Sequence, residues 1–330
     1  MSRPKGCTRL TRITTRAMFV AALVLASTAS AQSYPSRVIR IIVPQSAGGS
    51  TDLVARPIAK IMAESLGQPV IVDNRPGAGS IVGCDAVAKS PPDGYTLLMV
   101  AASFSISPSL VKQLPYDAVR DFSPITQVSA FPNILVVQSS SPLKSVGEFI
   151  AYAKANPGKL NYGSSGIGTG THLSTEMLKY MAGIDLVHVP YKGGAPSVAA
   201  LLAGQVQVVL ATISTALPHV RTGALRALAV TTAQRWPSVP DLPTLAESGL
   251  PGYDYTSWVG LLAPAKTPSG IVSRLWNETA KAARSAEMRK VLAQEAAEPV
   301  GNSPEQFAAI VEREISTWKK VVDAAGIKSE

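Results

Sequence analysis

Two successive series of alternating strand-like and helix-like patterns constrain the fold of this chain more than any other feature. In the first series, an apolar run predicts a strand, and apolar residues at helical spacing follow it, with Ser50, Thr51 or Asp52 as the N-cap and Gly67 as the stop. The predicted elements are a strand at 38–43, a helix at 51–66, a strand at 70–72, a helix at 81–89 and a strand ending near Val100. This order is typical of a parallel sheet covered by helices.

The second series restarts after a proline-rich passage that ends at Pro132. The predicted elements are strands at 134–138, 159–163, 186–191 and 206–211, helices at 145–156, 171–183 and 195–205, and a short helix followed by a strand within 216–231. Residues from Pro132 to about Tyr253 are therefore expected to form a second α/β unit of similar size.

The tail of the chain has a different pattern. A predicted strand at 257–264 precedes two long amphipathic helices at 268–289 and 304–325, with Trp276 and Trp318 on their buried faces. The economical arrangement returns this tail to the first unit and gives two lobes joined by two crossovers. The predicted parts are a signal peptide at 1–31, a first lobe formed by 32–132 and 255–330, and a second lobe formed by 133–254.

Residues 1–31 have the pattern of a secretory signal peptide. Basic residues precede the apolar run Met18–Ala26, and small residues follow as far as Ala31. The alternative is a membrane anchor, but an anchor needs an apolar run of about 20 residues to span a bilayer. We therefore expect export and cleavage before Gln32.

Charge and cysteine content narrow the function classes. Residues 1–31 carry five of the 31 Lys/Arg residues and no Asp/Glu, so their removal leaves 26 basic against 22 acidic residues and changes the net charge from +9 to +4. This weak positive charge suits anionic small molecules and gives no support for a nucleic-acid surface. Cys84 is then the only cysteine, which excludes an intrachain disulfide, and its apolar neighbours favour a buried structural thiol.

Four loops that follow predicted strands are rich in small and hydroxylated residues: 45–52, 101–109, 163–172 and 211–215. Ligands of open α/β sheets bind beyond the carboxyl ends of the strands. The first and third loops lead into helix N-termini, where unpaired N–H groups and the helix dipole favour an anion. Two such loops facing each other would hold a carboxylate from both lobes. The alternative, that these glycines only make tight turns, stays open.

Nucleotide binding is disfavoured at both glycine-rich loops. A Walker-type phosphate loop ends in Gly-Lys-Ser/Thr, whereas the first loop has Gly49-Ser50-Thr51 without a lysine. In the third loop, Thr171 stands where the spacing G-x-G-x-x-G requires its last glycine.

Catalysis has little support in the sequence, and we expect a protein that is not an enzyme and has no cofactor or metal. Of the three histidines, His188 lies in an apolar strand pattern, and only His172 is placed for chemistry, as a hydrogen-bond donor at a helix terminus. No G-x-S-x-G motif and no metal-ligand spacing occurs. The alternative function is a secreted serine hydrolase acting through Ser164 or Ser165 with His172.

Eight sequence blocks carry a resemblance to a known family. They are YPSRVIRIIVPQSAGGSTD, GQPVIVDNRPGAGS, KSPPDGYTLL, LPYDAVRDFSPIT, NPGKLNYGSSGIGTGTHL, VHVPYKGGAPSVAALLAGQVQ, LRALAVT and GLLAP. In this order and spacing they resemble the Bug family, the TctC-like periplasmic substrate-binding proteins of tripartite tricarboxylate transporters. The resemblance covers Gln32 to Glu330.

The resemblance implies an α/β, type II-like periplasmic binding fold, with two lobes that are each a mainly parallel sheet flanked by helices. It implies a periplasmic monomer that closes on a small carboxylate, such as a di- or tricarboxylate or an aromatic acid, and that serves a membrane transporter or a sensor. Asp52 is expected to brace its loop from behind. The ligand-binding residues implied are Ala47, Gly48, Gly49, Ser50, Thr51, Asp52, Ser103, Ser107, Ser164, Ser165, Gly166, Thr169, His172 and Thr212.

Departures from the family pattern bear on specificity. Many members have an apolar triplet where this chain has Gln45-Ser46-Ala47, and many have asparagine where it has Ser107. Several have Asp-Asn where this chain has Ala211-Thr212, which removes a partner for a ligand ammonium and favours a carboxylate without an amino group. A third function, an interaction module that recruits a membrane sensor and keeps a vestigial pocket, also stays open.

Overall fold

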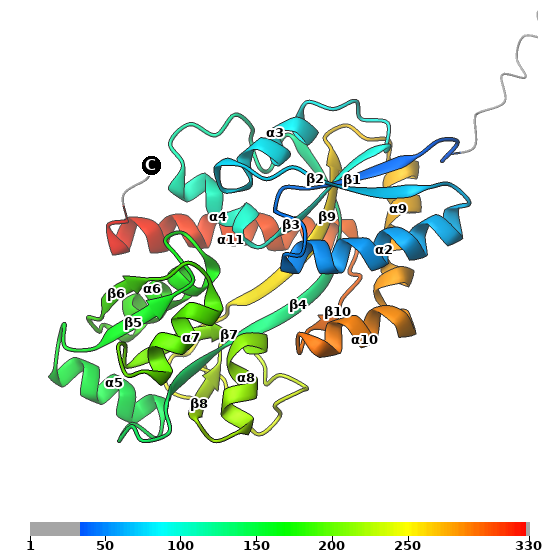
Figure 1. Ribbon diagram of the computed structural model, residues 1–330. Coiled ribbons are helices and arrows are strands. Elements are labelled where there is room, and N and C mark those ends of the chain that lie inside the picture. The colour runs from blue at the N-terminus through cyan, green and yellow to red at the C-terminus, as the bar shows by residue number, and fades with distance from the viewer. Residues whose placement is uncertain (1–33, 328–330) are drawn as a thin grey trace, which may run out of the picture. The chain divides into compact units, whose positions relative to one another are not determined.

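A curled, mixed β-sheet of ten strands runs through the body of the molecule, and helices flank it (Figure 1). The computed structural model describes residues 34–327, so the predicted signal peptide and its cleavage site lie outside the described residues. From Arg37 onward, the described residues form one compact unit. Within 34–327, no helix combines the length and the apolar character that crossing a membrane requires.

The strands are β1 (Ile39–Val43), β2 (Val70–Asn74), β3 (Thr96–Ala101), β4 (Phe122–Gln138), β5 (Asn161–Ser164), β6 (Val187–Pro190), β7 (Val208–Thr212), β8 (Leu225–Val230), β9 (Thr256–Pro264) and β10 (Glu298–Pro299). Their order is β2-β1-β3-β9-β4-β7-β5-β6, and β8 and β10 also pair with β4. The outer pairs are parallel, as the sequence predicted, whereas β4 and β9 run antiparallel to their partners. We call the part with β1–β3, β9 and β10 the first lobe and the part with β5–β8 the second lobe.

The helices are α2 (Ser50–Leu66), η1 (Ala78–Ser80), α3 (Ile81–Ala88), α4 (Ser103–Leu110), α5 (Val146–Ala155), α6 (Gly170–Ala182), α7 (Gly194–Leu202), α8 (Ile213–Arg221), α9 (Ser269–Ala283), α10 (Ala286–Gln294) and α11 (Pro304–Ala325). Most of them agree with the sequence pattern. Gly67 ends α2 in the left-handed conformation, which glycine adopts without steric cost, and Ser145 caps α5 by accepting from the backbone N–H of Glu148.

The long strand β4 replaces a shorter strand predicted at 134–138. It begins at Phe122, inside the proline-rich passage that precedes the second predicted series. Its register against β9 shifts next to Pro124 and again between Gln127 and Ser129. Such bulges accommodate a proline, which has no N–H to donate to the ladder. The strand therefore runs from one lobe into the other without a break.

Two of the four loops expected to line a ligand crevice are largely helical. The stretch 101–109 was predicted as a loop, but α4 occupies most of it and tolerates Pro108 close to its C-terminal end. The stretch 211–215 contains the end of β7 and the start of α8. Short helices with few apolar residues at helical spacing leave a weak signal in the sequence, which explains both errors.

Two helix boundaries also differ from prediction. The single helix expected at 268–289 is divided into α9 and α10, because Ser285 adopts an extended conformation and caps α10 by accepting from the N–H of Met288. The N-cap of α2 is Gly49 rather than one of the three polar residues that follow it, and it makes no side-chain cap.

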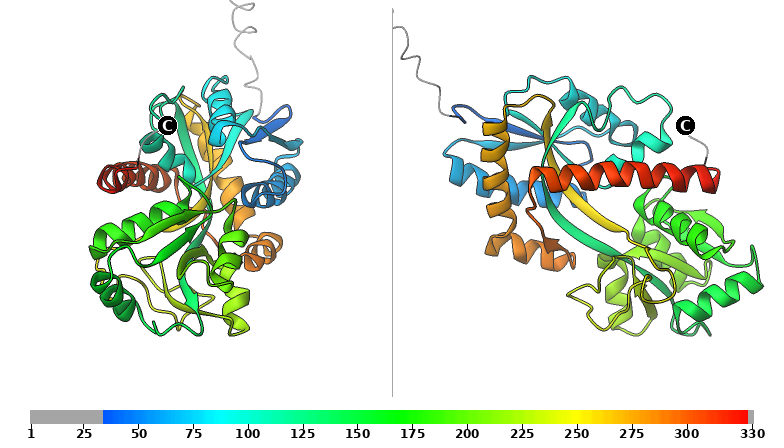
Figure 2. Two further views of the ribbon diagram at one scale, coloured as in Figure 1. Left: turned by 60° about the vertical axis from the view of Figure 1, so that its left-hand side comes forward. Right: turned by 180° about the vertical axis from the view of Figure 1, so that it is seen from behind.

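Helix α11 packs against both lobes and runs along the back of the molecule (Figure 2). Phe307 and Val311 lie in a core cluster of the first lobe, whereas Trp318 and Val322 lie in a core cluster of the second. It forms a third link beside β4 and β9. The lobe boundaries at 132/133 and 254/255 stay a prediction.

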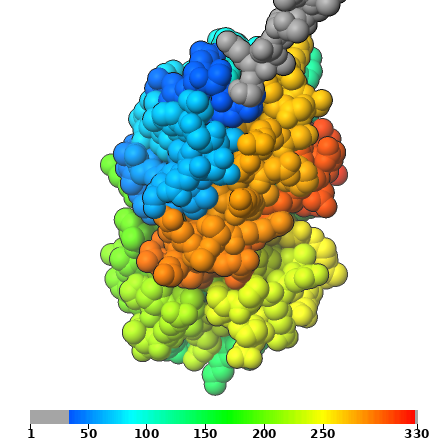
Figure 3. Space-filling model, turned by 90° about the vertical axis from the view of Figure 1, so that its right-hand side faces the viewer, coloured from blue at the N-terminus to red at the C-terminus, as the bar shows by residue number. Residues whose placement is uncertain are grey.

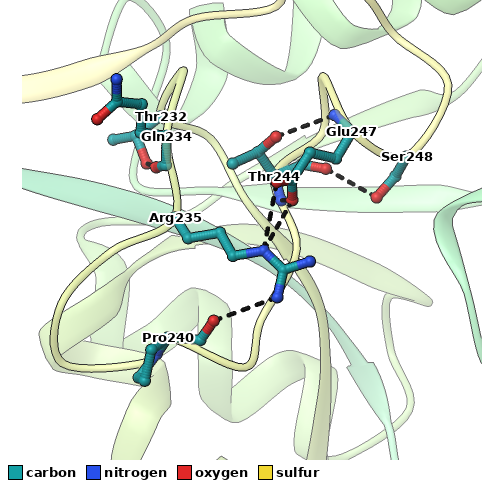
Figure 4. A network of polar contacts seen from close by, with 7 residues as sticks. All are labelled: Thr232, Gln234, Arg235, Pro240, Thr244, Glu247 and Ser248. Atoms are coloured by element: carbon teal, nitrogen blue, oxygen red, sulfur yellow. Dashed lines mark hydrogen bonds and ion pairs between the residues drawn. The ribbon is translucent and has the colours of Figure 1, made fainter.

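A polar network joins residues within the long connection between β8 and β9 (Figure 4). Thr244 and Glu247 cap each other, since each backbone N–H donates to the other side chain at 2.9 Å. Arg235 donates to the Glu247 carboxylate at 3.0 Å and to the carbonyl of Pro240. These contacts fix the route by which the chain reaches β9.

Candidate ligand-binding site

The first glycine-rich loop, between β1 and α2, is held by a buried carboxylate. Asp52 is 2% exposed, and its Oδ2 accepts from the backbone N–H of Gly48 at 2.9 Å and from Arg56 at 2.8 Å. Its Oδ1 accepts from Asn74 at 3.0 Å, and the same amide of Asn74 donates to the carbonyl of Gln45. This confirms the expectation that Asp52 braces the loop from behind.

The electrostatics of Asp52 agree with this bracing role. Burial works to raise the pKa of its carboxyl group, but the hydrogen bonds from Arg56, Gly48 and Asn74 outweigh burial and lower that pKa. The group is therefore a buried anion whose charge is matched by its own hydrogen-bond donors.

The N-terminus of α2 keeps donors available at the exposed side of this loop. Gly49 provides no side-chain cap, so the N–H groups of the first turn are not capped by a side chain. Ala47, Gly48 and Ser50 are exposed, and Thr51 is buried with no hydrogen-bond partner for Oγ1 within the described residues. This end of α2 has the properties of an anion site.

The second glycine-rich loop, between β5 and α6, is held by neutral groups. Ser165 N–H donates to Thr171 Oγ1 at 2.9 Å, and the hydroxyl of Thr169 donates to the carbonyl of Gly166 at 2.7 Å. Thr169 is also the N-cap of α6, since its side chain accepts from the N–H of His172. In contrast to α2, this helix already has a side-chain cap.

The buried side chain of His172 bonds to the backbone of this loop. Its Nδ1 accepts from the backbone N–H of Gly168 at 3.1 Å, so the imidazole is an acceptor here and not the donor that the sequence predicted. It is 4% exposed and stacks on His188 with ring centroids 4.1 Å apart. Tyr162 stacks on His188 in turn and donates to Glu176 at 2.5 Å.

Burial makes both imidazoles weak bases. It lowers the pKa of His172, which the nearby Glu176 partly opposes, and it lowers the pKa of His188 to about 4 with help from the adjacent His172. At neutral pH both rings are therefore uncharged, as the contact from Gly168 requires.

The hydrolase alternative predicted a contact of Ser164 or Ser165 with His172, and the structure places these side chains differently. Ser164 Oγ lies 2.6 Å from Nε2 of His188, and Ser165 Oγ lies 2.7 Å from the hydroxyl of Thr171. Ser164 is fully buried, and within residues 34–327 no hydrogen bond joins His188 to a carboxylate. A serine and a histidine meet here without the acid and the access that nucleophilic catalysis needs.

Two cavities are lined by the remaining candidate ligand-binding residues, and both lobes contribute to each lining. The first, which we call the Ser107 cavity, has a volume of about 360 Å³ and is lined by Ser103 and Ser107 of α4 and by Gly168 of the second loop. The second, the Thr212 cavity, has a volume of about 280 Å³ and is lined by Ser50 of α2 and Thr212 at the start of α8. Residues of the first lobe thus face residues of the second in each case.

Sequence reasoning missed several residues that shape these loops. Arg56 follows Asp52 at helical spacing i,i+4, a signal that was readable in the sequence, whereas Asn74 lies on a neighbouring strand and left none. The role of His188 depends on the parallel register that pairs it with Tyr162. Within the described part of the chain, no group of three His, Cys, Asp or Glu could hold a metal ion.

Comparisons with known proteins agree with this geometry. The chain matches the tripartite tricarboxylate transporter family receptor, TctC, over residues 54–327. Protein BugT of Bordetella pertussis is 37% identical to it over 313 residues, which cover 94% of this chain and 96% of BugT.

Two solved structures of ligand complexes are similar throughout. Rpa4515 of R. palustris with adipate is 40% identical at a TM-score of 0.75 and covers 89% of this chain and 99% of its own. MatC (Rpa3494) from Rhodopseudomonas palustris with bound malate is 34% identical at a TM-score of 0.72 and covers 88% and 100%. These matches confirm the α/β, two-lobed periplasmic binding fold. The chain therefore belongs to the TctC, or Bug, family of periplasmic solute-binding proteins.

Proposed function

We propose that this protein is a periplasmic receptor that holds a small organic carboxylate between its lobes and delivers it to a membrane transporter or a sensor. The observation that carries the proposal is the N-terminus of α2, which lacks a side-chain cap, carries exposed glycine backbone and borders a cavity shared with the second lobe. Such a terminus binds anions through backbone N–H groups and the helix dipole.

The related structures support this class of ligand. Rpa4515 is described with adipate and MatC with malate, and both compounds are small carboxylates. In this chain, we assign the carboxylate contacts to the backbone N–H groups of Ser50 and Thr51 at the start of α2 and to the hydroxyl of Thr212, because Ser50 and Thr212 border the same cavity. Asp52 and His172 act on the loops from behind and are positioning residues.

Lobe closure about β4 and β9 is the mechanism that we propose for capture. The predicted crossovers lie near 131–134 and 252–258, and α11 adds a third link that limits the amplitude of the motion. Small-angle scattering with and without ligand tests this, with a smaller radius of gyration expected at saturation. An unchanged radius of gyration would contradict closure.

The export step and the oligomeric state complete the proposal. We expect cleavage between Ala31 and Gln32 and a monomeric mature protein, which mass spectrometry and light scattering of the periplasmic protein test directly. A mature N-terminus at another residue would contradict the assigned cleavage site, and a dimer in solution would contradict the assigned monomer.

Calorimetric titration of the mature protein with mono-, di- and tricarboxylates tests the function itself. At least one acid is expected to bind and to raise the melting temperature, because a ligand of the folded state must stabilise that state. Mass spectrometry of denatured extracts identifies any acid that co-purifies. Absence of binding by every acid, together with an empty extract, would contradict the receptor function and favour the interaction module.

A further inference from the structure

The Thr212 cavity, of about 280 Å³, offers both polar and apolar lining residues to a ligand. Its walls come from α2, β4 and α10 of the first lobe and from α8 of the second. In Figure 3, the orange surface of α9 and α10 lies between the blue surface of the first lobe and the lime and yellow surface of the second. Helix α10 therefore contributes the wall of the cavity on this side of the molecule.

Part of the cavity lining is polar and rich in donors. Helices α2 and α8 both begin at this cavity without a side-chain cap, at Ser50 and after Thr212. The hydroxyl of Thr215 donates to the carbonyl of Thr212 at 2.8 Å and lies 3.4 Å from its hydroxyl oxygen, which leaves the Thr212 hydrogen available. These groups together suit one carboxylate.

A buried hydroxyl adds an independent requirement for a ligand or a water molecule. Ser129 lines the cavity, is 1% exposed and has no hydrogen-bond partner for Oγ among residues 34–327. An unpaired buried hydroxyl costs about 1–3 kcal/mol, so an occupant that pairs with it is stabilised.

The rest of the cavity is apolar. Its apolar lining residues include Leu53 and Val54 of α2, Phe131 of β4 and Leu292 of α10. Leu53 is 46% exposed, an unusual position for a leucine in the first turns of a helix that is otherwise well packed. Contact with a hydrocarbon ligand would remove this apolar surface from water.

The charge of the lining residues determines whether this cavity favours monocarboxylates or dicarboxylates. Glu295 is the only charged residue among those that line it, and no lysine or arginine does so. A ligand with one carboxylate on the donors of Ser50 and Thr212 and a second carboxylate within the cavity would place that second charge among lining residues of which only Glu295 is charged. Two like charges in a partly desolvated cleft repel by about 1–2 kcal/mol, which corresponds to about a tenfold loss of affinity or more.

We infer that the ligand of this cavity is a monocarboxylate with a hydrocarbon body. This inference rests on the proposed receptor function and makes it specific: the carboxylate binds at Ser50 and Thr212, and the hydrocarbon body packs on Leu53, Phe131 and Leu292. Glu295 weakens the binding of dicarboxylates of the same length.

Hexanoate and adipate form a matched pair for the test, because they have the same number of carbons and differ by one carboxylate. Calorimetric titration of the mature protein is expected to give about tenfold tighter binding of hexanoate than of adipate. Glu295→Lys is expected to strengthen adipate binding by about tenfold and to change hexanoate binding by less than about threefold. Glu312→Lys, at an exposed position of α11, is the matched control for the change in net charge and is expected to change neither.

Each outcome decides between the two proposals. Equal or tighter binding of adipate by the unmodified protein overturns the monocarboxylate inference and leaves the receptor function intact, as does binding of malate alone. An effect of Glu312→Lys as large as that of Glu295→Lys overturns the assignment to Glu295. Failure of every carboxylate to bind overturns the receptor function itself.

Discussion

The two glycine-rich loops occupy equivalent places in the two lobes, yet they are held by opposite chemistry. The first loop is held by a buried anion, Asp52, which accepts from backbone, arginine and amide donors. The second is held by uncharged hydroxyls and by His172, which accepts from Gly168. The helix after the first loop has no side-chain cap, whereas Thr169 caps the helix after the second.

This difference indicates which loop can stabilise the negative charge of a ligand. The Asp52 carboxylate fixes the backbone of the first loop, and Arg56 balances its negative charge. The unpaired N–H groups at the start of α2 are therefore available to bind an anion. In the second loop, the N–H of Ser165 and the hydroxyl of Thr169 donate to other groups of the same loop and are not free to bind a ligand. We therefore expect the first loop to dominate ligand affinity and the second to respond more strongly to pH.

Removal of the Asp52 carboxylate is the largest change that we predict. Asp52→Ala leaves the N–H of Gly48 and the amide of Asn74 without their acceptor, and it leaves Arg56 without its ion-pair partner. A cost of about 2–4 kcal/mol in the free energy of unfolding is expected, because hydrogen bonds to a charged group contribute about 1.5–3 kcal/mol each and Arg56 can be resolvated. Urea denaturation measures it.

The matched control for this prediction is an exposed ion pair. Asp323 pairs with Lys319 at 2.9 Å, and both side chains are exposed. Asp323→Ala is expected to cost less than about 1 kcal/mol, as surface pairs do. Equal effects of the two substitutions would show that Asp52 does not brace its loop.

The second prediction concerns the neutral brace. His172→Phe removes the acceptor for Gly168 and is expected to cost about 1–3 kcal/mol, because the N–H is left unpaired in a partly buried loop. His172→Asn can place its Oδ1 where Nδ1 lies and is expected to recover part of this loss. Urea denaturation of both variants gives the comparison. If Phe and Asn are equally destabilising, packing and not the hydrogen bond explains the role of His172.

Much of this framework could be predicted from the sequence, because it rests on local signals. The helical spacing after Ser50 and the stop at Gly67 fixed α2, and the acidic side chain so close to a proposed anion site indicated that Asp52 braces its loop. The contact between Ser164 and His188 could not be predicted, since it depends on the parallel register of β5 and β6. The full length of β4 could not be predicted either. Proline normally ends a strand, but a bulge next to Pro124 allows β4 to continue.

The third prediction uses the pH dependence of stability to separate the contribution of the two buried histidines from that of Asp52. Burial lowers the pKa of His172 and His188 below the value near 6.5 that each has in the unfolded chain, so the unfolded state binds more protons as the pH falls. The stability contributed by the neutral rings is present above pH 6.5 and is lost as the pH falls toward about 4. The pKa of Asp52 is lowered from 3.8, so its contribution is lost only at more acidic pH.

Between pH 7 and pH 5 we therefore expect the two rings to lower the free energy of unfolding by about 1–2 kcal/mol. Burial raises the pKa of Glu314 to about 7, so its protonation in the folded state opposes this fall over the same range, and the effect of the rings is obtained by comparison with a variant that lacks them. Glu176 and Lys179 of α6 face the same rings and carry opposite charges, so they largely offset each other. Urea denaturation at the two pH values measures the change in the free energy of unfolding, and His172→Asn with His188→Asn is expected to remove the part of it that is due to the rings. An equal change in the double variant would assign the pH dependence to other groups.

The smallest change in stability, and the sharpest test of the comparison, comes from giving the first loop the cap that the second already has. Gly49 has φ −72° and ψ 165°, which any residue can adopt, and an added Cβ would lie 3.3 Å from the carbonyl oxygen of Ser46. Gly49→Ser is expected to change stability by only a few tenths of a kcal/mol, because serine and glycine differ little at an N-cap.

Ligand affinity should respond differently to this substitution. The new Oγ would accept from an N–H of the first turn that we assign to the ligand carboxylate, so affinity is expected to fall several-fold. Gly49→Ala adds the same Cβ without the oxygen and is expected to reduce affinity less, which separates capping from crowding. Calorimetric titration of both variants decides the point: if Ser and Ala weaken binding equally, the uncapped helix terminus is not the anion site, and the two loops are more alike in function than in their internal bonding.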